Sequence, residues 1–172
     1  MTIQQLHLFN GIGLAGLVIV AFLTRATAPR IAGALVGGVA FGVAALGIIA
    51  LGEEVRWWHF AITWAPYYLT LMLIDIALPS AYVNLITWRI ARRFGWRGLA
   101  VTAAAAALIG PPRDSWYMNR FPEWGAYGPG IAPVLAVSAI YVIMVVLGYA
   151  VMRLVAGPPR EDRLARRPQD SG

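Results

Sequence analysis

Residues 31–51 read IAGALVGGVAFGVAALGIIAL, a run of 21 residues without a charge. A helix needs about 20 predominantly apolar residues to cross roughly 30 Å of hydrocarbon. Residues 6–23 form a similar apolar run, and residues 131–152 form a third, which is also uncharged. The sequence therefore predicts an all-α protein, a polytopic integral membrane helix bundle.

The composition of the 172-residue chain agrees with this class. Hydrophobic residues make up 59% of the chain and charged residues only 13%, whereas soluble domains usually carry about 25% charged residues. No cysteine is present, which excludes disulfides, thiolate catalysis and cysteine-ligated metals. The net charge of +6 comes from arginines beside the predicted spans, so we expect the lipid bilayer and not nucleic acid as the partner.

The middle of the chain divides less easily into spans. Residues 57–88 are apolar and aromatic, and as one helix they would be about 48 Å long, too long for one span and too short for two. Pro66 is the natural point of division. We therefore expect an interfacial segment at residues 53–65 and a third span at residues 67–90.

The fourth apolar run is short. Residues 98–109 supply only about 18 Å of helix before Gly110, Pro111 and Pro112, where the prolines are expected to stop it. The sequence therefore predicts a fourth span at residues 94–110 that begins below the apolar run or ends inside the bilayer.

The positions of the arginines predict the orientation of the five spans. Five spans place eleven of the 14 arginines on one side and leave Arg56, Arg113 and Arg120 on the other. We therefore expect the N-terminus outside and the C-terminus in the cytoplasm, in the plasma membrane of a bacterium. Residues 1–156 would form one transmembrane domain, followed by a basic, disordered tail at residues 157–172.

The first apolar run resembles a signal peptide in one respect only. Ala26, Thr27 and Ala28 look like a small-residue cleavage site, but no basic residue precedes the run and Arg25 lies in the expected cleavage region. We expect this helix to be retained.

Four glycines of the second span have the spacing that lets two helices approach closely. Gly33 and Gly37, and likewise Gly38 and Gly42, follow the small-xxx-small pattern. The pattern predicts either a homo-oligomer through these faces or ordinary packing within one bundle, and the second interpretation is favoured.

Asp75 is the clearest polar group inside a predicted span. It lies four residues before Pro79, whose ring removes the hydrogen bond to the carbonyl of residue 75. A carboxyl group at membrane depth indicates a function, either as a proton donor or as the partner of an arginine. The alternative is a protonated side chain that bonds a neighbouring helix.

A second polar cluster follows the second span. Trp57 and Trp58 are typical of an interfacial aromatic belt, but adjacent Glu53 and Glu54 are not, so we expect one carboxylate to point into the bundle. His59 carries an imidazole that can exchange protons and form hydrogen bonds, and it is a candidate for binding a substrate. Haem held by His7 and His59 is a minor alternative to an expected absence of cofactor and metal.

The third polar stretch is GPPRDSWYMNRFPEWGAYGPG at residues 110–130. Arg113 and Asp114 are adjacent and cannot easily pair head-on with one another, so we expect Arg113 to meet Glu53, Glu54 or Asp75 and Asp114 to meet Arg56 or Arg120. Irregular backbone at membrane depth needs protein or a water-filled cavity around it, and an external polar loop is the alternative. The substrate-binding candidates of this stretch are Arg113, Trp116, Tyr117, Asn119, Arg120, Glu123 and Trp124.

These groups predict a polar pocket in the outer half of the bundle. Carboxylates at residues 53, 54, 75 and 114 are the candidate catalytic groups, because a carboxylic acid that burial keeps neutral can deliver a proton. We expect a membrane-embedded acid/base enzyme of the cyclase or isomerase type that acts on an isoprenoid or another lipid-like apolar substrate. The alternatives are a non-catalytic membrane subunit, a scaffold, and a lipid-binding or transport protein.

Overall fold

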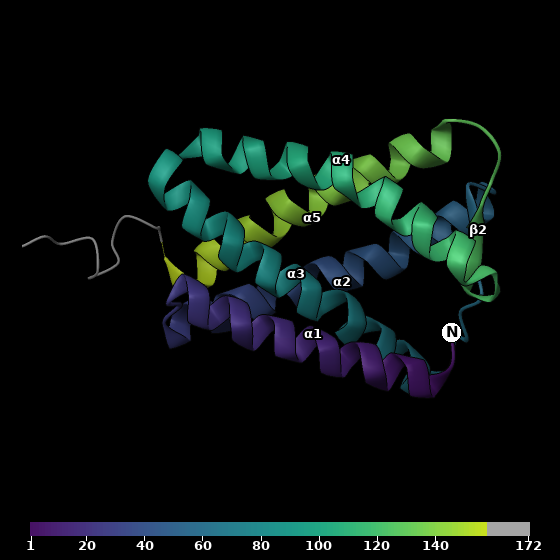
Figure 1. Ribbon diagram of the computed structural model, residues 1–172, viewed down its shortest axis with the longest axis horizontal. Coiled ribbons are helices and arrows are strands. Elements are labelled where there is room, and N and C mark those ends of the chain that lie inside the picture. The colour runs from purple at the N-terminus through teal and green to yellow at the C-terminus, as the bar shows by residue number, and fades with distance from the viewer. Residues whose placement is uncertain (158–172) are drawn as a thin grey trace, which may run out of the picture.

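The computed structural model describes residues 1–157, which form five long helices (Figure 1). The helices are α1 (Ile3–Thr24), α2 (Ala28–Glu54), α3 (Pro66–Phe94), α4 (Trp96–Arg120) and α5 (Ala132–Ala156). Short elements lie in the connections, namely strands β1 (Trp58–Phe60) and β2 (Gly125–Tyr127) and the 3-10 helix η1 (Pro122–Trp124). The helical fold is confirmed, and the predicted tail lies outside the described residues except for Gly157.

Four of the helices, α1, α2, α3 and α5, are long and apolar enough to cross a membrane. Helix α4 does not meet the same condition, because its charged side chains and two prolines lower its mean hydropathy. The membrane character of the chain is therefore supported, while the count of five spans and the orientation stay predictions.

Helix α3 lies at the centre of the bundle. Helix α1 packs mainly against α3, α2 packs between α3 and α5, and α4 packs against α5 and α3. The four glycines of α2 are all buried at these contacts, and a side chain at Gly37 or Gly38 would overlap the backbone of α5 or α3. They therefore serve packing within one chain, and a homo-oligomer stays untested.

The expected end of the fourth helix at residue 110 is wrong. Helix α4 continues through Pro111 and Pro112 to Arg120. Each proline removes one backbone hydrogen bond, a defect of about 3 kcal/mol in an isolated helix. Pro111 is buried and Gly110 lies against the ring of Tyr141 on α5, so packing against α5 holds the helical path across this defect.

The two strands close one end of the bundle and were not expected from the sequence. Strands β1 and β2 pair in antiparallel register, with Trp58 opposite Tyr127 and Phe60 opposite Gly125. The expected interfacial segment at residues 53–65 therefore contains the end of α2 and all of β1. A carboxylate oxygen of Glu53 accepts a hydrogen bond of 2.8 Å from the backbone N–H of Phe60, which fixes β1 to the end of α2.

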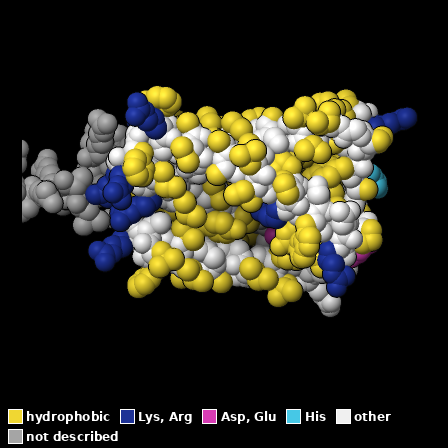
Figure 2. Space-filling model, turned by 45° about the horizontal axis from the view of Figure 1, so that its top comes forward, with side chains coloured by type: hydrophobic (Ala, Val, Ile, Leu, Met, Phe, Trp, Pro, Cys, Tyr) yellow, Lys and Arg dark blue, Asp and Glu magenta, His cyan; other side chains and the backbone are white. Residues whose placement is uncertain are grey.

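The opposite end of the bundle is basic and has short connections. Gly95 alone joins α3 to α4, and its φ of 63° and ψ of −141° suit glycine and few other residues. Dark blue side chains gather at this end in Figure 2. The helix bounds place these arginines there: Arg25, Arg30, Arg89, Arg92, Arg93, Arg97 and Arg153.

Candidate functional site

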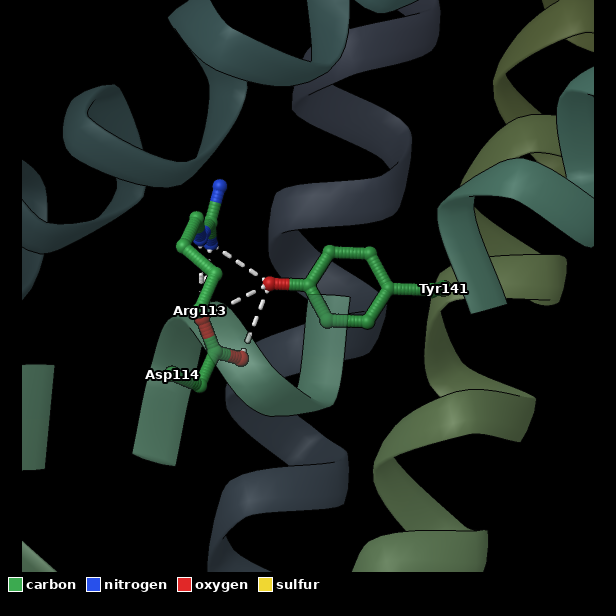
Figure 3. Close-up of polar contacts among 3 residues, drawn as sticks. All are labelled: Arg113, Asp114 and Tyr141. Atoms are coloured by element: carbon green, nitrogen blue, oxygen red, sulfur yellow. Dashed lines mark hydrogen bonds and ion pairs between the residues drawn. The ribbon is translucent and has the colours of Figure 1, made fainter. Parts of the chain in front are cut away.

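Three polar side chains of α4 and α5 form one hydrogen-bonded cluster (Figure 3). Arg113 donates from Nε and Nη2 to Oδ1 of Asp114, over 3.1 and 2.8 Å. The Tyr141 hydroxyl lies 2.9 and 2.8 Å from the two carboxylate oxygens of Asp114, to which it donates, and it accepts a bond of 2.5 Å from Nη2 of Arg113. The guanidinium and the carboxylate therefore hold the phenol in one orientation.

Local packing places this cluster where α4 crosses α5. A side chain at Gly110 would overlap the ring of Tyr141, so only glycine lets the phenol lie this close to α4. Arg113 and Asp114 follow one turn later on the same helix. The guanidinium also lies over the ring of Tyr141, with Cζ 5.5 Å from the ring centroid.

The observed Arg113–Asp114 pair contradicts the partners expected from the sequence. Arg113 bonds Asp114 in place of Glu53, Glu54 or Asp75, and Asp114 bonds neither Arg56 nor Arg120 in the part of the chain described. The long arginine side chain curls back toward its neighbour, and the Tyr141 hydroxyl supplies a third partner that makes this arrangement favourable.

Helix α3 adds two groups near the cluster. Asp75 and Tyr82 lie within electrostatic range of Arg113, but among the described residues Asp75 makes no direct bond with Arg113. Asp75 is half-buried, and no hydrogen bond to its carboxyl group is found within residues 1–157.

Tyr127 of β2 also belongs to these surroundings. Burial raises the pKa of its hydroxyl above the ordinary value, the negative charge of Asp114 adds to the rise, and the positive charge of Arg113 opposes it. The hydroxyl therefore stays neutral over the physiological pH range.

The predicted spans of α3 and α5 would place the cluster at the depth of the hydrocarbon. Asp75 is nine residues from the start of α3, and Tyr141 is nine residues from the start of α5, which is about 14 Å along each helix. These helices have 29 and 25 residues and are thus about 44 and 38 Å long, against roughly 30 Å of hydrocarbon. Polar groups there cost a few kcal/mol each unless they are paired, which the Arg113–Asp114 bond achieves.

A hollow runs along the bundle between α1 and α4, over α3. Figure 2 shows hydrophobic side chains lining it, with basic and acidic atoms at its end nearer the strands. Tyr82 of α3 lies at the floor of this hollow. Its ring is 3.4 Å from the position that a Cβ atom at Gly16 of α1 would take, and it is within electrostatic range of Arg113 and Tyr117 of α4.

Aromatic rings join α1 to α4 near the strands. Trp124 of η1 makes an edge contact with Phe9 of α1, at a centroid distance of 5.4 Å. It also stacks on Tyr117 and Phe121, at 6.4 and 4.2 Å. The predicted residues Trp124 and Tyr117 therefore form an aromatic cap that joins α1 to α4.

Other predicted site residues lie outside this cluster. Glu53 and His59 meet at the strands, where Nδ1 of His59 is 3.7 Å from the carboxylate, and Glu54 is exposed at the end of α2. Trp116 and Asn119 are exposed on α4, the guanidinium of Arg120 lies over the ring of Phe121, and Glu123 is exposed on η1. His7 bonds the hydroxyl of Tyr67 over 3.0 Å.

Sequence reasoning missed Tyr141 and Tyr82, and it assigned Gly110 to the end of the fourth helix and not to a contact with Tyr141. All three lie in apolar helix sequence, where tyrosine and glycine are ordinary residues. The available signal was the position of Tyr141, because a hydroxyl nine residues inside a span needs a partner. Within residues 1–157 no group of three or more metal-ligating side chains is found, and the haem hypothesis stays a prediction.

Comparisons with protein-family models, with curated proteins and with solved structures give no match.

Proposed function

We propose that the chain is a membrane-embedded acid/base enzyme that acts on a lipid-like apolar substrate. The observation that supports this most is the Arg113–Asp114–Tyr141 cluster near Asp75, at the end of an apolar hollow and at a level that the predicted spans would place in the hydrocarbon. Polar groups inside a membrane protein are costly and usually serve a function.

In this proposal Asp75 gives or takes the proton. Its carboxyl group has no hydrogen bond among the described residues, so it is available to a substrate. Arg113 stabilises negative charge that develops on a substrate oxygen. Asp114 and Tyr141 are positioning residues, because their hydrogen bonds fix the guanidinium.

The direction of substrate entry follows from the same geometry. Apolar substrates would enter the hollow sideways from the bilayer, because the aromatic cap lies near its strand end. Glu53, Glu54 and His59 have no part in this site. A cyclase or isomerase reaction on an isoprenoid is one form of this chemistry, since both need a positioned acid or base.

The test is the lipid extract of cells that express the chain, measured by mass spectrometry. Asp75→Asn is expected to abolish the product that the wild-type chain generates, with unchanged abundance in the membrane fraction. Glu54→Gln, the same loss of charge at an exposed position, is the matched control and should keep the product. Wild-type product levels with Asp75→Asn would refute the enzyme proposal.

A binding or transport protein is the second candidate. The 53% exposure of the Arg113 side chain favours it, because a guanidinium open to the hollow can hold a ligand without any chemistry. Identical lipid extracts with and without the chain, together with ligand binding at Arg113, would decide for this candidate.

A further inference from the structure

We propose that the hollow between α1 and α4 takes a neutral lipid with one long hydrocarbon chain and an uncharged acceptor oxygen, such as that of a ketone, which accepts a hydrogen bond from Arg113. This inference deepens the proposed function, since it names the substrate class of the same site. It rests on the unused donors of Arg113, the charge balance of the cluster and the shape of the hollow.

Arg113 has N–H donors that the cluster does not use. Its Nε and Nη2 atoms are engaged by Asp114 and Tyr141, but no hydrogen bond from Nη1 is found among residues 1–157. The side chain is 53% exposed, and Figure 3 shows one guanidinium nitrogen directed away from Asp114 and Tyr141. Two N–H groups at hydrocarbon depth favour any ligand that brings an acceptor oxygen.

Charge balance selects a neutral ligand over an anion. Arg113 and Asp114 are 2.8 Å apart and neutralise each other. A carboxylate or phosphate would add an uncompensated negative charge beside Asp114 and within range of Asp75, in surroundings of low dielectric. A ketone oxygen accepts the hydrogen bonds of the guanidinium without that cost.

The hollow fits a hydrocarbon chain. From Asp75 the face of α3 continues through Tyr82, beside α1, to Ile86, which is one turn further on and 38% exposed. Eleven residues separate Asp75 from Ile86, about 16 Å along the helix. Hydrophobic side chains line the hollow in Figure 2.

The experiment measures binding to the purified full chain in detergent by native mass spectrometry, with three probes of similar branched carbon skeleton. Phytone is a neutral ketone, phytane is the hydrocarbon and phytanic acid is the anion. We expect phytone to bind the wild-type chain at least about tenfold more tightly than either of the others, as a hydrogen bond to a charged donor allows.

Variants then locate the site. Arg113→Gln should weaken phytone binding about tenfold, and Arg113→Lys should retain part of it. Arg97→Gln makes the same substitution at the other end of α4 and should bind as the wild type does. Because Arg113→Gln leaves Asp114 without its partner, the double variant Arg113→Gln/Asp114→Asn is a second test that keeps the site neutral.

A bulky residue tests the hollow itself. Ile86→Trp should weaken phytone binding, whereas Val18→Trp, on the exposed side of α1, should not. Equal binding of all three probes, tighter binding of phytanic acid, or phytone binding that none of the Arg113 variants changes would each overturn the proposed ligand.

The experiments can refute the ligand proposal and the enzyme proposal independently of each other. Phytone binding that depends on Arg113, combined with lipid extracts that Asp75→Asn does not alter, supports the ligand and refutes the enzyme. Loss of product with Asp75→Asn, combined with phytone binding that is independent of Arg113, supports the enzyme and refutes the ligand.

Discussion

Gly110→Ala tests how α4 and α5 create the polar cluster. The added methyl carbon would lie 2.6 Å from Cγ of Tyr141 and still closer to two other ring atoms, whereas ordinary contact begins at 3.4 Å. The ring must therefore move by more than the 0.8 Å (3.4 − 2.6) that the contact with Cγ alone requires, and its hydroxyl must move with it. Bonds of 2.8 and 2.9 Å to Asp114 would then approach or exceed the limit for a hydrogen bond.

Two costs add up for this variant. Overpacking in a close-packed interior costs about 1–3 kcal/mol. Each hydrogen bond between membrane helices contributes on average about 0.6 kcal/mol, and up to about 1.7. We therefore expect Gly110→Ala to lower the free energy of unfolding by about 2–4 kcal/mol.

The assay is reversible unfolding of the purified chain in mixed micelles, followed by circular dichroism. Gly47→Ala is the matched control, because a methyl group there meets no other atom within 4 Å and should be neutral or slightly stabilising. In a Tyr141→Ala background the cost of Gly110→Ala should largely disappear. A stability of Gly110→Ala within about 0.5 kcal/mol of the Gly47→Ala control would refute the described contact.

Three other predictions concern the cluster, the strands and the topology. Tyr141→Phe should lower the free energy of unfolding by about 1 kcal/mol, measured in the same assay, because the cluster loses its phenol hydroxyl; no change would mean that the hydroxyl bonds contribute nothing. Gly52→Ala should loosen the packing of β1 against the end of α2, because the new methyl group would overlap the ring of Trp58. Hydrogen exchange at residues 58–60, measured by mass spectrometry, should then be faster. Unchanged exchange there would contradict this packing. The chain has no cysteine, so Trp96→Cys and Glu123→Cys can each be labelled alone with an impermeant maleimide. A spanning α4 predicts labelling from opposite sides of the membrane, and labelling from one side would exclude the fifth span.

Apolar run length predicted the helical architecture well. Residues 31–51 lie within α2, and all but the first residue of 131–152 lie within α5, because long uncharged segments have few alternatives to a helix in a membrane. The end of the fourth helix was not predictable in this way. Prolines at 111 and 112 weaken a helix locally, and only the packing of Gly110 against Tyr141 shows why the helix continues.

The candidate site was predictable in part. The residues Asp75, Arg113 and Asp114 stood out as charges within or beside apolar sequence. Their pairing did not, because Tyr141 comes from a helix 27 residues further along the chain and lies in ordinary apolar sequence. The two strands could not be predicted either, because a strand of three residues gives no periodic pattern that distinguishes it from a loop.

The one-residue connection at Gly95 makes α3 and α4 the two arms of a hinge. Arg113 lies 18 residues beyond this point, which is about 27 Å of helix, so a change of about 5° in the angle between the arms would move it by about 2 Å relative to Asp75. That displacement is comparable to the length of a hydrogen bond. The contact of Gly110 with Tyr141 then limits the angle between α3 and α4. This angle in turn sets the distance between Arg113 and Asp75.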